Sequence, residues 1–522
     1  MSWLRQWVFD HPYRLILFAI FALGCGFIAL SPPFEGFDET AHWSSLARWG
    51  LDGRMPIYGQ DRLDQAIYDY SGPLPYSSAL PFDVNGGQTY HDFAPSQNVG
   101  PHHQTPPQNT QPTAHLNWQA QHPPLYYLIL QPVFQLTKSW SWADHFLALR
   151  MMSWILAFSG LVIGVEFTRW AWPNLNQGQV MVLAAWPLLV PQFIPEMARL
   201  GNDSLCLLCF ALAWAALLKL EENKRPLRWA IVLGLALGAG LWTKAFFIPI
   251  SAGLTVYIAL RAWQTGGRYW LTYGVLALGL AGLIGVGWYL YKWTAYGNII
   301  GGDEMLQFDK DGGVFLNFLR EVTPFALVRG YSAIAASFVW AGSWSLARPA
   351  EWMLIGPCVL VAGLGLRWAW RLRLQRLKDA LPLFVLVPML GGLSYHMMLR
   401  IALTGEGVGI PGWYLHILAP ALALILALAW PQKGWQRWGV WSLSAYTLVF
   451  TAWAWLQLLA LYSGCAIKQA ETKHIVWPQG ACLIDLAQMQ SLAYPFMGFG
   501  FLALACFFSG LGAYMLKRQA AA

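Results

Sequence analysis

Long apolar segments recur along almost the whole chain, and polar positions concentrate in the stretches between them. About 20 consecutive apolar residues cross the hydrocarbon core of a bilayer as one helix. We expect twelve such helices, at residues 14–31, 146–168, 179–196, 203–221, 228–243, 245–262, 270–291, 350–370, 382–403, 412–430, 438–461 and 493–515. Two more apolar segments, 123–137 and 325–346, are short or interrupted by Gly and Pro, and we expect them to lie at the outer interface. The pattern predicts an all-α polytopic membrane protein with a single transmembrane domain.

Basic residues mark one side of this predicted membrane domain. Arg5 and Arg14 precede the first apolar segment, which places the N-terminus in the cytoplasm under the positive-inside rule. With twelve helices, every dense basic cluster then falls on the cytoplasmic side. These clusters contain Lys219, Lys224, Arg225, Arg228, Arg261, Arg268, Arg367, Arg371, Arg373, Arg376, Lys378, Lys433, Arg437, Lys517 and Arg518. A span at 123–137 would turn the later clusters outward, so we exclude it.

Composition narrows the class further. The 522 residues are 57% hydrophobic and 11% charged, with a mean hydropathy of +0.41, whereas soluble domains are about 25% charged. The net charge of +7 is spread between apolar segments rather than gathered in one patch, so we expect no nucleic-acid partner. The sequence has no GxxxxGK[ST] phosphate loop and no soluble cytoplasmic domain, which argues against a kinase or an ATP-driven transporter.

This topology leaves three larger segments outside the membrane: 32–145, which includes interfacial helices, 292–349 and 462–492. The first begins with GFDETAHWSSLARWG, in which the apolar positions have helical spacing. Asp38 and His42 are four residues apart and would share a helix face. Asp38 is either the N-cap of a helix that starts at Glu39 or a carboxylate base directed at the membrane surface.

Six motifs occur along the chain in a characteristic order. They are FDETAHW at 37–43, QHPPLYYLIL at 121–130, RLGNDSL at 199–205, LWTKAFFIP at 241–249, SFVWAGSWSL at 337–346 and GWYLHILAPALAL at 412–424. Together they resemble the GT-C superfamily of membrane glycosyltransferases, in particular a bacterial membrane-protein family with an Asp-Glu-x-x-His motif in its first outer loop. The resemblance implies a GT-C-like fold in the bacterial inner membrane, with the active site on the outer face.

The resemblance also implies a reaction. A sugar would pass from a polyprenyl-phosphate-linked donor to an extracytoplasmic glycan, lipid or protein, with an acid in the first loop as the base. An inverting transfer needs such a base to deprotonate the acceptor hydroxyl. Asp38 is our candidate, Glu39 is the alternative, and His42 would orient either one.

Positive charge is also required, because the departing phosphate must be stabilised. Four cations lie at the outer ends of predicted helices and are candidates for binding the donor phosphate: Lys244, Arg199, Arg150 and Arg400. Each has a structural alternative. Lys244 would snorkel to the interface, Arg199 would pair with Asp203, and Arg150 would pair with Asp144.

Four further residues are candidates for the cavity or the acceptor site: His122, Glu304, Tyr414 and His416. His122 stands at a His-Pro-Pro corner and would face the cavity. Glu304 would contact acceptor or metal, or lie at the surface. The family usually has Gly-Arg-Tyr at the start of GWYLH, so Trp413 stands where a cation is common, and Tyr414 fits an aromatic belt.

Metal-binding and cysteine patterns complete the set of expectations. The outer residues His91, Asp92, His102, His103, His115 and His122 match no tight zinc spacing, so we expect no resident metal. Some members of the superfamily use a divalent ion, which stays an alternative. Cys465 and Cys482 are the cysteines placed in outer loops, and the oxidising compartment favours a disulfide between them.

Two other functions compete with single-sugar transfer. A polysaccharide polymerase or ligase would use a whole glycan on a lipid diphosphate, but such proteins tend to carry their large outer loop late in the chain. A lipid or solute transporter would carry ionisable residues midway along its spans. Most of the predicted spans contain no charge, which disfavours ion coupling.

Overall fold

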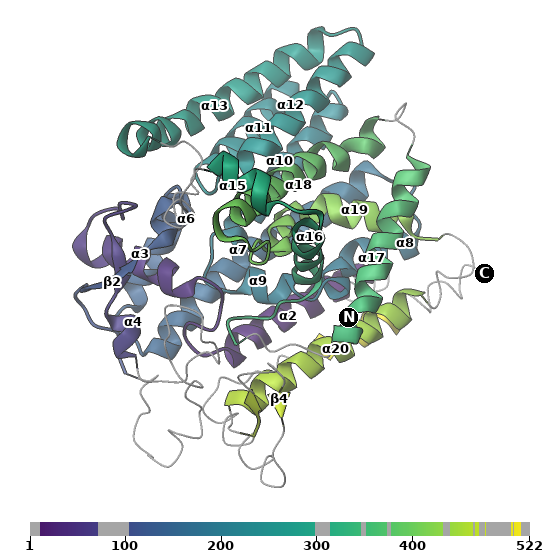
Figure 1. The fold of residues 1–522 in the computed structure, drawn as a ribbon. Coiled ribbons are helices and arrows are strands. Elements are labelled where there is room, and N and C mark those ends of the chain that lie inside the picture. Colours follow the sequence, from purple (N-terminus) through teal and green to yellow (C-terminus); the bar gives the residue numbers. More distant parts are fainter. Residues whose placement is uncertain are drawn as a thin grey trace.

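The computed structural model describes residues 11–70, 104–297, 314–345, 351–372, 377–431, 439–462, 465–468, 475–476, 503–504 and 506–512. Within them the chain is almost entirely helical (Figure 1). Two short antiparallel pairs supply the strands: β1 (Arg62–Asp64) with β2 (Pro112–Leu116), and β3 (Ile467–Lys468) with β4 (Ile475–Val476).

The long helices coincide with the predicted spans. They are α2 (Tyr13–Leu30), α7 (Trp142–Ala171), α10 (Asp203–Glu221), α11 (Pro226–Leu241), α12 (Phe247–Gln264), α13 (Arg268–Tyr296), α17 (Glu351–Arg371), α18 (Leu377–Thr404) and α20 (Gly439–Tyr462). In the described part of the chain, seven helical stretches are long and apolar enough to cross a membrane. These findings confirm an all-α polytopic membrane protein. The count of twelve spans stays a prediction, since 493–515 lies mostly outside the described residues.

Two predicted spans are not single regular helices. Segment 179–196 divides into α8 (Gln177–Leu189) and α9 (Phe193–Ala198). The break falls at Val190, because the residue before a proline, here Pro191, is pushed out of the α region. Segment 412–430 starts as the 3₁₀ helix η3 (Gly412–Leu418) and continues as α19 (Ala419–Ala429).

The described residues of the first predicted outer segment form a small layer beside the long helices. It contains α3 (Glu39–Asp52), α4 (Ala66–Asp69), η2 (Trp118–Gln121) and α6 (Leu125–Thr137). Helices α3, α4 and α6 gather with β2 at the left of Figure 1. Helix α6 covers the predicted interfacial segment 123–137. At 13 residues and about 20 Å it is too short to cross the hydrocarbon core. The second interfacial segment corresponds to α16 (Pro324–Val339), preceded by α15 (Val314–Glu321).

The helices differ strongly in burial. Of the most apolar stretch of α10, 83% is buried, against 22% for α17. Helix α10 packs on α7, α11 and η3 and so forms the centre of the domain. The N-terminal ends of α3 and α10 and the C-terminal end of α11 meet beside this centre, and the candidate site is built there.

Candidate active site

Asp38 stands at the start of α3 in an unusual backbone conformation. Its φ of 61° lies in the left-handed region, which costs non-glycine residues roughly 1–3 kcal/mol and which Asp tolerates better than most. The side chain does not cap the helix. Instead its Oδ1 accepts a hydrogen bond from Trp118 Nε1 at 3.0 Å. The carboxylate is partly exposed, and among the described residues no basic side chain lies within 4 Å of it.

Glu39, the next residue, has the opposite environment. It is fully buried, and its carboxylate accepts hydrogen bonds from Arg150 Nε (2.7 Å) and Nη2 (2.5 Å). The backbone N–H groups of Gly36 and Leu200 donate to the same carboxylate, each at 2.9 Å. Glu39 therefore fastens the start of α3 to α7 and to the turn before α10. These four hydrogen bonds leave it poorly placed to accept a further proton donor.

Arg150 is committed to the same junction. Besides Glu39, it donates to the carbonyl oxygens of Ser31 and Pro32, at 2.5 and 2.8 Å. The alternative partner Asp144 accepts a hydrogen bond from Ser141 at the start of α7 instead. Four of the five N–H bonds of the guanidinium thus go to protein oxygens, so Arg150 closes the α2–α3 junction.

Two acidic and two basic residues near Asp38 form a chain of ion pairs. Arg199 bonds to Glu196 (2.6 and 3.1 Å) and to Asp203 (3.1 Å), and Lys244 reaches both oxygens of Asp203 at 2.9 Å. All four residues are at most 5% exposed. Each of the two cations therefore has at least one carboxylate partner inside the protein.

This chain of ion pairs touches the loop that carries Asp38. Arg199 Nη1 donates to the carbonyl oxygen of Phe37 at 2.7 Å. Burial lowers the pKa of Arg199, but the charges of Glu196, Asp203 and Asp38 outweigh burial and raise the pKa overall. The charge of Asp38 therefore stabilises the Arg199 guanidinium, although the Asp38 carboxylate forms no ion pair with it. We call Asp38, the four ion-paired residues, His42 and His122 the cluster.

The two histidines of the cluster are neutral at physiological pH. Burial lowers the pKa of His42 well below its usual value, and the nearby Arg199 lowers it further. Burial, with Lys244 next, does the same to the pKa of His122. His42 Nδ1 lies 3.0 Å from the hydroxyl of Tyr127, so this tyrosine fixes the ring. The role of His42 in orienting either acid stays a prediction, since the hydrogen bond of its ring is to Tyr127.

A row of aromatic rings leads from Lys244 to the Asp38 loop. The Lys244 ammonium lies 4.5 Å from the ring of Phe246 and 4.6 Å from that of Tyr414. Tyr414 contacts Trp413, which stacks on Phe37 with centroids 4.7 Å apart and planes 14° apart. Trp413 therefore joins this row to the Asp38 loop through a flat apolar surface.

Arg400 and His416 complete the described candidates. Among the described residues the Arg400 guanidinium has no carboxylate within 4 Å, and its Nε is buried without a hydrogen-bond partner. It packs on Gly409, whose φ of 118° requires glycine. His416 is fully buried, and its Nε2 lies 2.9 Å from the carbonyl oxygen of Phe338. His416 therefore holds η3 against α16.

Several other candidates are placed elsewhere or lie outside the described residues. The latter are Glu304, Cys482, His91, Asp92, His102 and His103. Cys465 is disulfide-bonded, and His115 stacks on Tyr68. Within the described part of the chain, no group of three or more His, Cys, Asp or Glu side chains has the arrangement of a metal site.

Three residues of the candidate site were not predicted from the sequence: Trp118, Tyr127 and Glu196. Trp118 and Tyr127 flank the His-Pro-Pro corner at 122–124, so their proximity to a predicted cavity residue was an available signal. Glu196 lies three residues before Arg199, the spacing of an ion pair on one helical turn. Glu196 was not chosen as a candidate because it is the last residue of the predicted span 179–196.

The fold and this cluster define a class, an all-α polytopic membrane protein with a polar site at one end of its helices. No protein-family model and no curated protein matches the sequence. The chain is similar to ArnT from Cupriavidus metallidurans bound to undecaprenyl phosphate, with 12% identity and a TM-score of 0.45, covering 97% of this chain and 78% of that one. It is also similar to the Archaeoglobus fulgidus oligosaccharyltransferase tethered to an acceptor peptide (10% identity, TM-score 0.41). That match covers 97% of this chain and 56% of the archaeal one, so this chain spans about half its length.

Proposed function

We propose that this protein is a GT-C-type glycosyltransferase of the bacterial inner membrane. It would transfer one sugar from a polyprenyl-phosphate-linked donor to a hydroxyl of an extracytoplasmic glycan, lipid or protein, with inversion at the anomeric carbon. The proposal rests on the ordered motifs of the sequence and on the contrast between the adjacent acids Asp38 and Glu39. The transfer would take place on the outer face, where the positive-inside rule puts the first loop.

Asp38 carries the proposal. A general base needs a carboxylate that is ionised, oriented and able to reach a substrate proton. Asp38 is oriented by the Trp118 indole, is partly exposed, and among the described residues has no basic partner within 4 Å that would occupy it. Glu39 is buried in four hydrogen bonds. Asp38 is therefore the acid that suits catalysis, and Glu39 is the acid that suits structure.

The proposed transfer is a single displacement at the anomeric carbon. Asp38 takes the proton of the acceptor hydroxyl as its oxygen attacks the anomeric carbon from the side opposite the phosphate. The bond between that carbon and the phosphate oxygen breaks, and the electron pair leaves with the polyprenyl phosphate. The acceptor gains the sugar, and the leaving group is a phosphate monoester that needs positive charge nearby.

Arg400 and Lys244 suit the phosphate better than the other two candidate cations. Among the described residues Arg400 has no carboxylate partner. Lys244 gives two hydrogen bonds to Asp203, and an ammonium has three to give. Arg199 and Arg150 are buried and bind protein oxygens on most sides, so we assign them to holding the Asp38 loop. The aromatic row between Lys244 and Phe37 offers flat apolar surfaces of the kind that line ligand sites.

The test is the substitution Asp38→Asn in purified protein supplied with short-chain polyprenyl-phosphate hexoses. Asparagine also tolerates the left-handed region and can still accept the Trp118 hydrogen bond, but it is not a base. We expect turnover to fall about 10²- to 10⁴-fold, with the donor KM unchanged. Glu39→Gln is the matched control. Its turnover should fall only in proportion to the amount of folded protein that is lost. Full turnover in folded Asp38→Asn protein would refute the proposal.

A further inference from the structure

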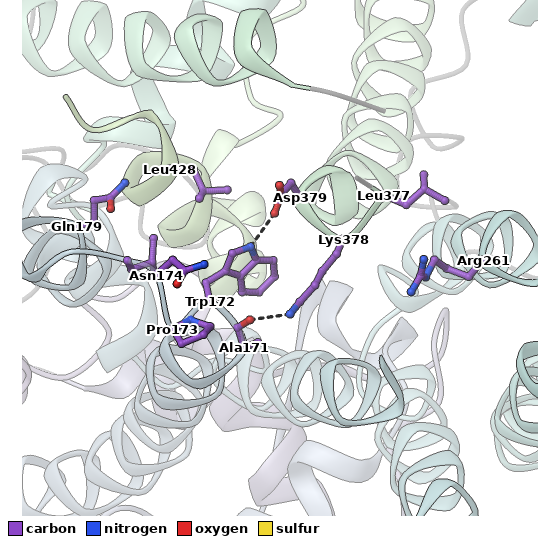
Figure 2. Close-up of a pocket in the computed structure, with 11 residues that line it drawn as sticks. Ala171, Trp172, Pro173, Asn174, Gln179, Arg261, Leu377, Lys378, Asp379 and Leu428 are labelled. Atoms are coloured by element: carbon purple, nitrogen blue, oxygen red, sulfur yellow. Dashed lines mark hydrogen bonds between the residues drawn. The ribbon is translucent and has the colours of Figure 1, made fainter. Parts of the chain in front are cut away.

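A cavity of about 580 Å³ lies where the C-terminal end of α7 meets the start of α18 (Figure 2). This volume is within the range of small-molecule sites, about 300–1,000 Å³. The lining combines apolar side chains such as Leu175 and Leu428 with the polar groups of Asn174, Arg261 and Lys378. Nothing in the proposed reaction uses this cavity.

The cavity lies at the opposite end of the helices from Asp38. Arg150, which binds Glu39 beside Asp38, and Ala171, which lines the cavity, belong to the same helix, α7. At 1.5 Å per residue they are about 30 Å apart along its axis, which is the thickness of the hydrocarbon core. The cavity is therefore at the other membrane interface, which the charge pattern predicts to face the cytoplasm.

Lys378 contributes a positive charge to the cavity, and the carboxylates of Glu221 and Asp379 act on it only at longer range. Its ammonium donates to the carbonyl oxygen of Ala171 at 2.6 Å and lies 4.7 Å from the ring centroid of Trp172. The neighbouring Asp379 turns to the other side of the indole, where it accepts a hydrogen bond from Trp172 Nε1 at 2.8 Å (Figure 2). Among the described residues no carboxylate lies within 4 Å of the Lys378 ammonium.

Arg261 lines the cavity opposite Lys378 and, unlike Lys378, forms an ion pair. Its guanidinium pairs with Glu221 through Nε and Nη2, so its charge is already matched. An ammonium has three N–H bonds to donate, and the Ala171 carbonyl accepts only one from Lys378. A negatively charged group entering the cavity would therefore bind Lys378 first, with Asn174 at the exposed rim.

We propose that this cavity binds a phosphate group through Lys378, either that of an anionic phospholipid head group or that of a soluble phosphate compound. Basic pockets between transmembrane helices at the cytoplasmic interface bind such head groups. The apolar part of the lining suits the glycerol and the first methylenes of a lipid. The proposal does not depend on the transferase reaction, because it concerns the opposite face.

The experiment measures binding to the full-length protein in a neutral detergent, without donor or acceptor. Phosphatidylglycerol, phosphatidylcholine and inorganic phosphate are titrated separately, and thermal unfolding and native mass spectrometry report binding. We expect phosphatidylglycerol to bind and stabilise the protein more than phosphatidylcholine does. Lys378→Met should weaken phosphatidylglycerol binding roughly 10- to 100-fold, the value of a hydrogen-bonded charge.

Two further variants separate binding from folding. Lys219→Met removes another cation at the same end of the helices, one that pairs with Glu222 outside the cavity, and should leave binding unchanged. Asn174→Trp adds bulk at the exposed rim without touching Lys378 and should also weaken binding. If inorganic phosphate alone reproduces the effect, the site takes a soluble phosphate compound. The proposal would be overturned if Lys378→Met and Asn174→Trp both left the binding of phosphatidylglycerol and of inorganic phosphate unchanged.

Discussion

Replacing Glu39 by glutamine should destabilise the protein far more than replacing Asp38 by asparagine. The Glu39 side chain is 0% exposed and faces the Arg150 guanidinium, whose side chain is 2% exposed. Glutamine has nearly the same shape, but it removes the negative charge. Its amide NH₂ would also replace one oxygen that now accepts hydrogen bonds.

The magnitude follows from the burial of the pair. Removing one partner of a buried ion pair leaves the other charge without compensation and costs about 3–5 kcal/mol. That shifts the ratio of folded to unfolded protein by roughly 10²- to 10⁴-fold. Asp38 has no ion pair among the described residues, so Asp38→Asn should change the free energy of unfolding by less than about 1 kcal/mol.

The assay is reversible unfolding of purified protein in mixed micelles, followed by helical circular dichroism. Arg150→Met should be as damaging as Glu39→Gln. The double variant should be less damaging than the sum of the two, because it leaves no unpaired charge. If Glu39→Gln unfolds like wild type but has lost turnover, while Asp38→Asn stays active, Glu39 is the base and the assignment is wrong by one residue.

Three more predictions concern the rest of the molecule. Gly253→Ala should destabilise the contact of α12 with α18, since a Cβ there would lie 1.6 Å from a backbone oxygen of α18. Gly279→Ala should have no such effect, because the space around Gly279 is open, and unfolding in the same assay compares the two variants. Burial raises the pKa of Asp64 to about 6, above its unfolded value. The folded state then holds the proton more tightly, so stability should fall by up to about 3 kcal/mol as pH rises from 4 to 7, and Asp64→Asn should remove that fall in thermal unfolding scans. Cysteines introduced at Thr113 and Lys224 should react with impermeant thiol reagents from opposite sides of the membrane, and labelling from one side would contradict the topology.

The transmembrane helices could be located from the sequence because their signal is local. A run of apolar residues with basic residues at its ends is enough to place α2, α7 and α10 within a few residues of their observed ends. The break between α8 and α9 was also visible, as Pro191 within the apolar run, but hydropathy alone does not register it. Length and apolarity therefore predict which segments are helical more reliably than they predict whether a helix is continuous.

The pairing of the charged side chains could not be predicted in the same way. The sequence places Asp38 and Glu39 side by side, and both have the chemistry of a base. What separates them is the left-handed backbone at Asp38, which turns one carboxylate to Trp118 and the other to Arg150. Trp118 is 80 residues away and Arg150 is 111 residues from Glu39, so the choice depends on tertiary contacts that no local pattern contains.

The ion pair between Lys244 and Asp203 predicts that substitutions of its two partners change the donor KM in opposite directions. If Lys244 binds the donor phosphate, Asp203 competes with the phosphate for the same ammonium. Lys244→Met should then raise the donor KM. Asp203→Asn should lower it, because the ammonium is released while Arg199 keeps its partner Glu196.

A purely structural lysine would behave differently. Both substitutions would then reduce the amount of folded protein and leave the donor KM of the folded fraction unchanged. The two variants must therefore be compared as folded protein, with KM and kcat measured separately over a range of donor concentrations. A donor KM that moves in the same direction in both variants would contradict a competition for the Lys244 ammonium, and Arg400 would then be the cation to test next.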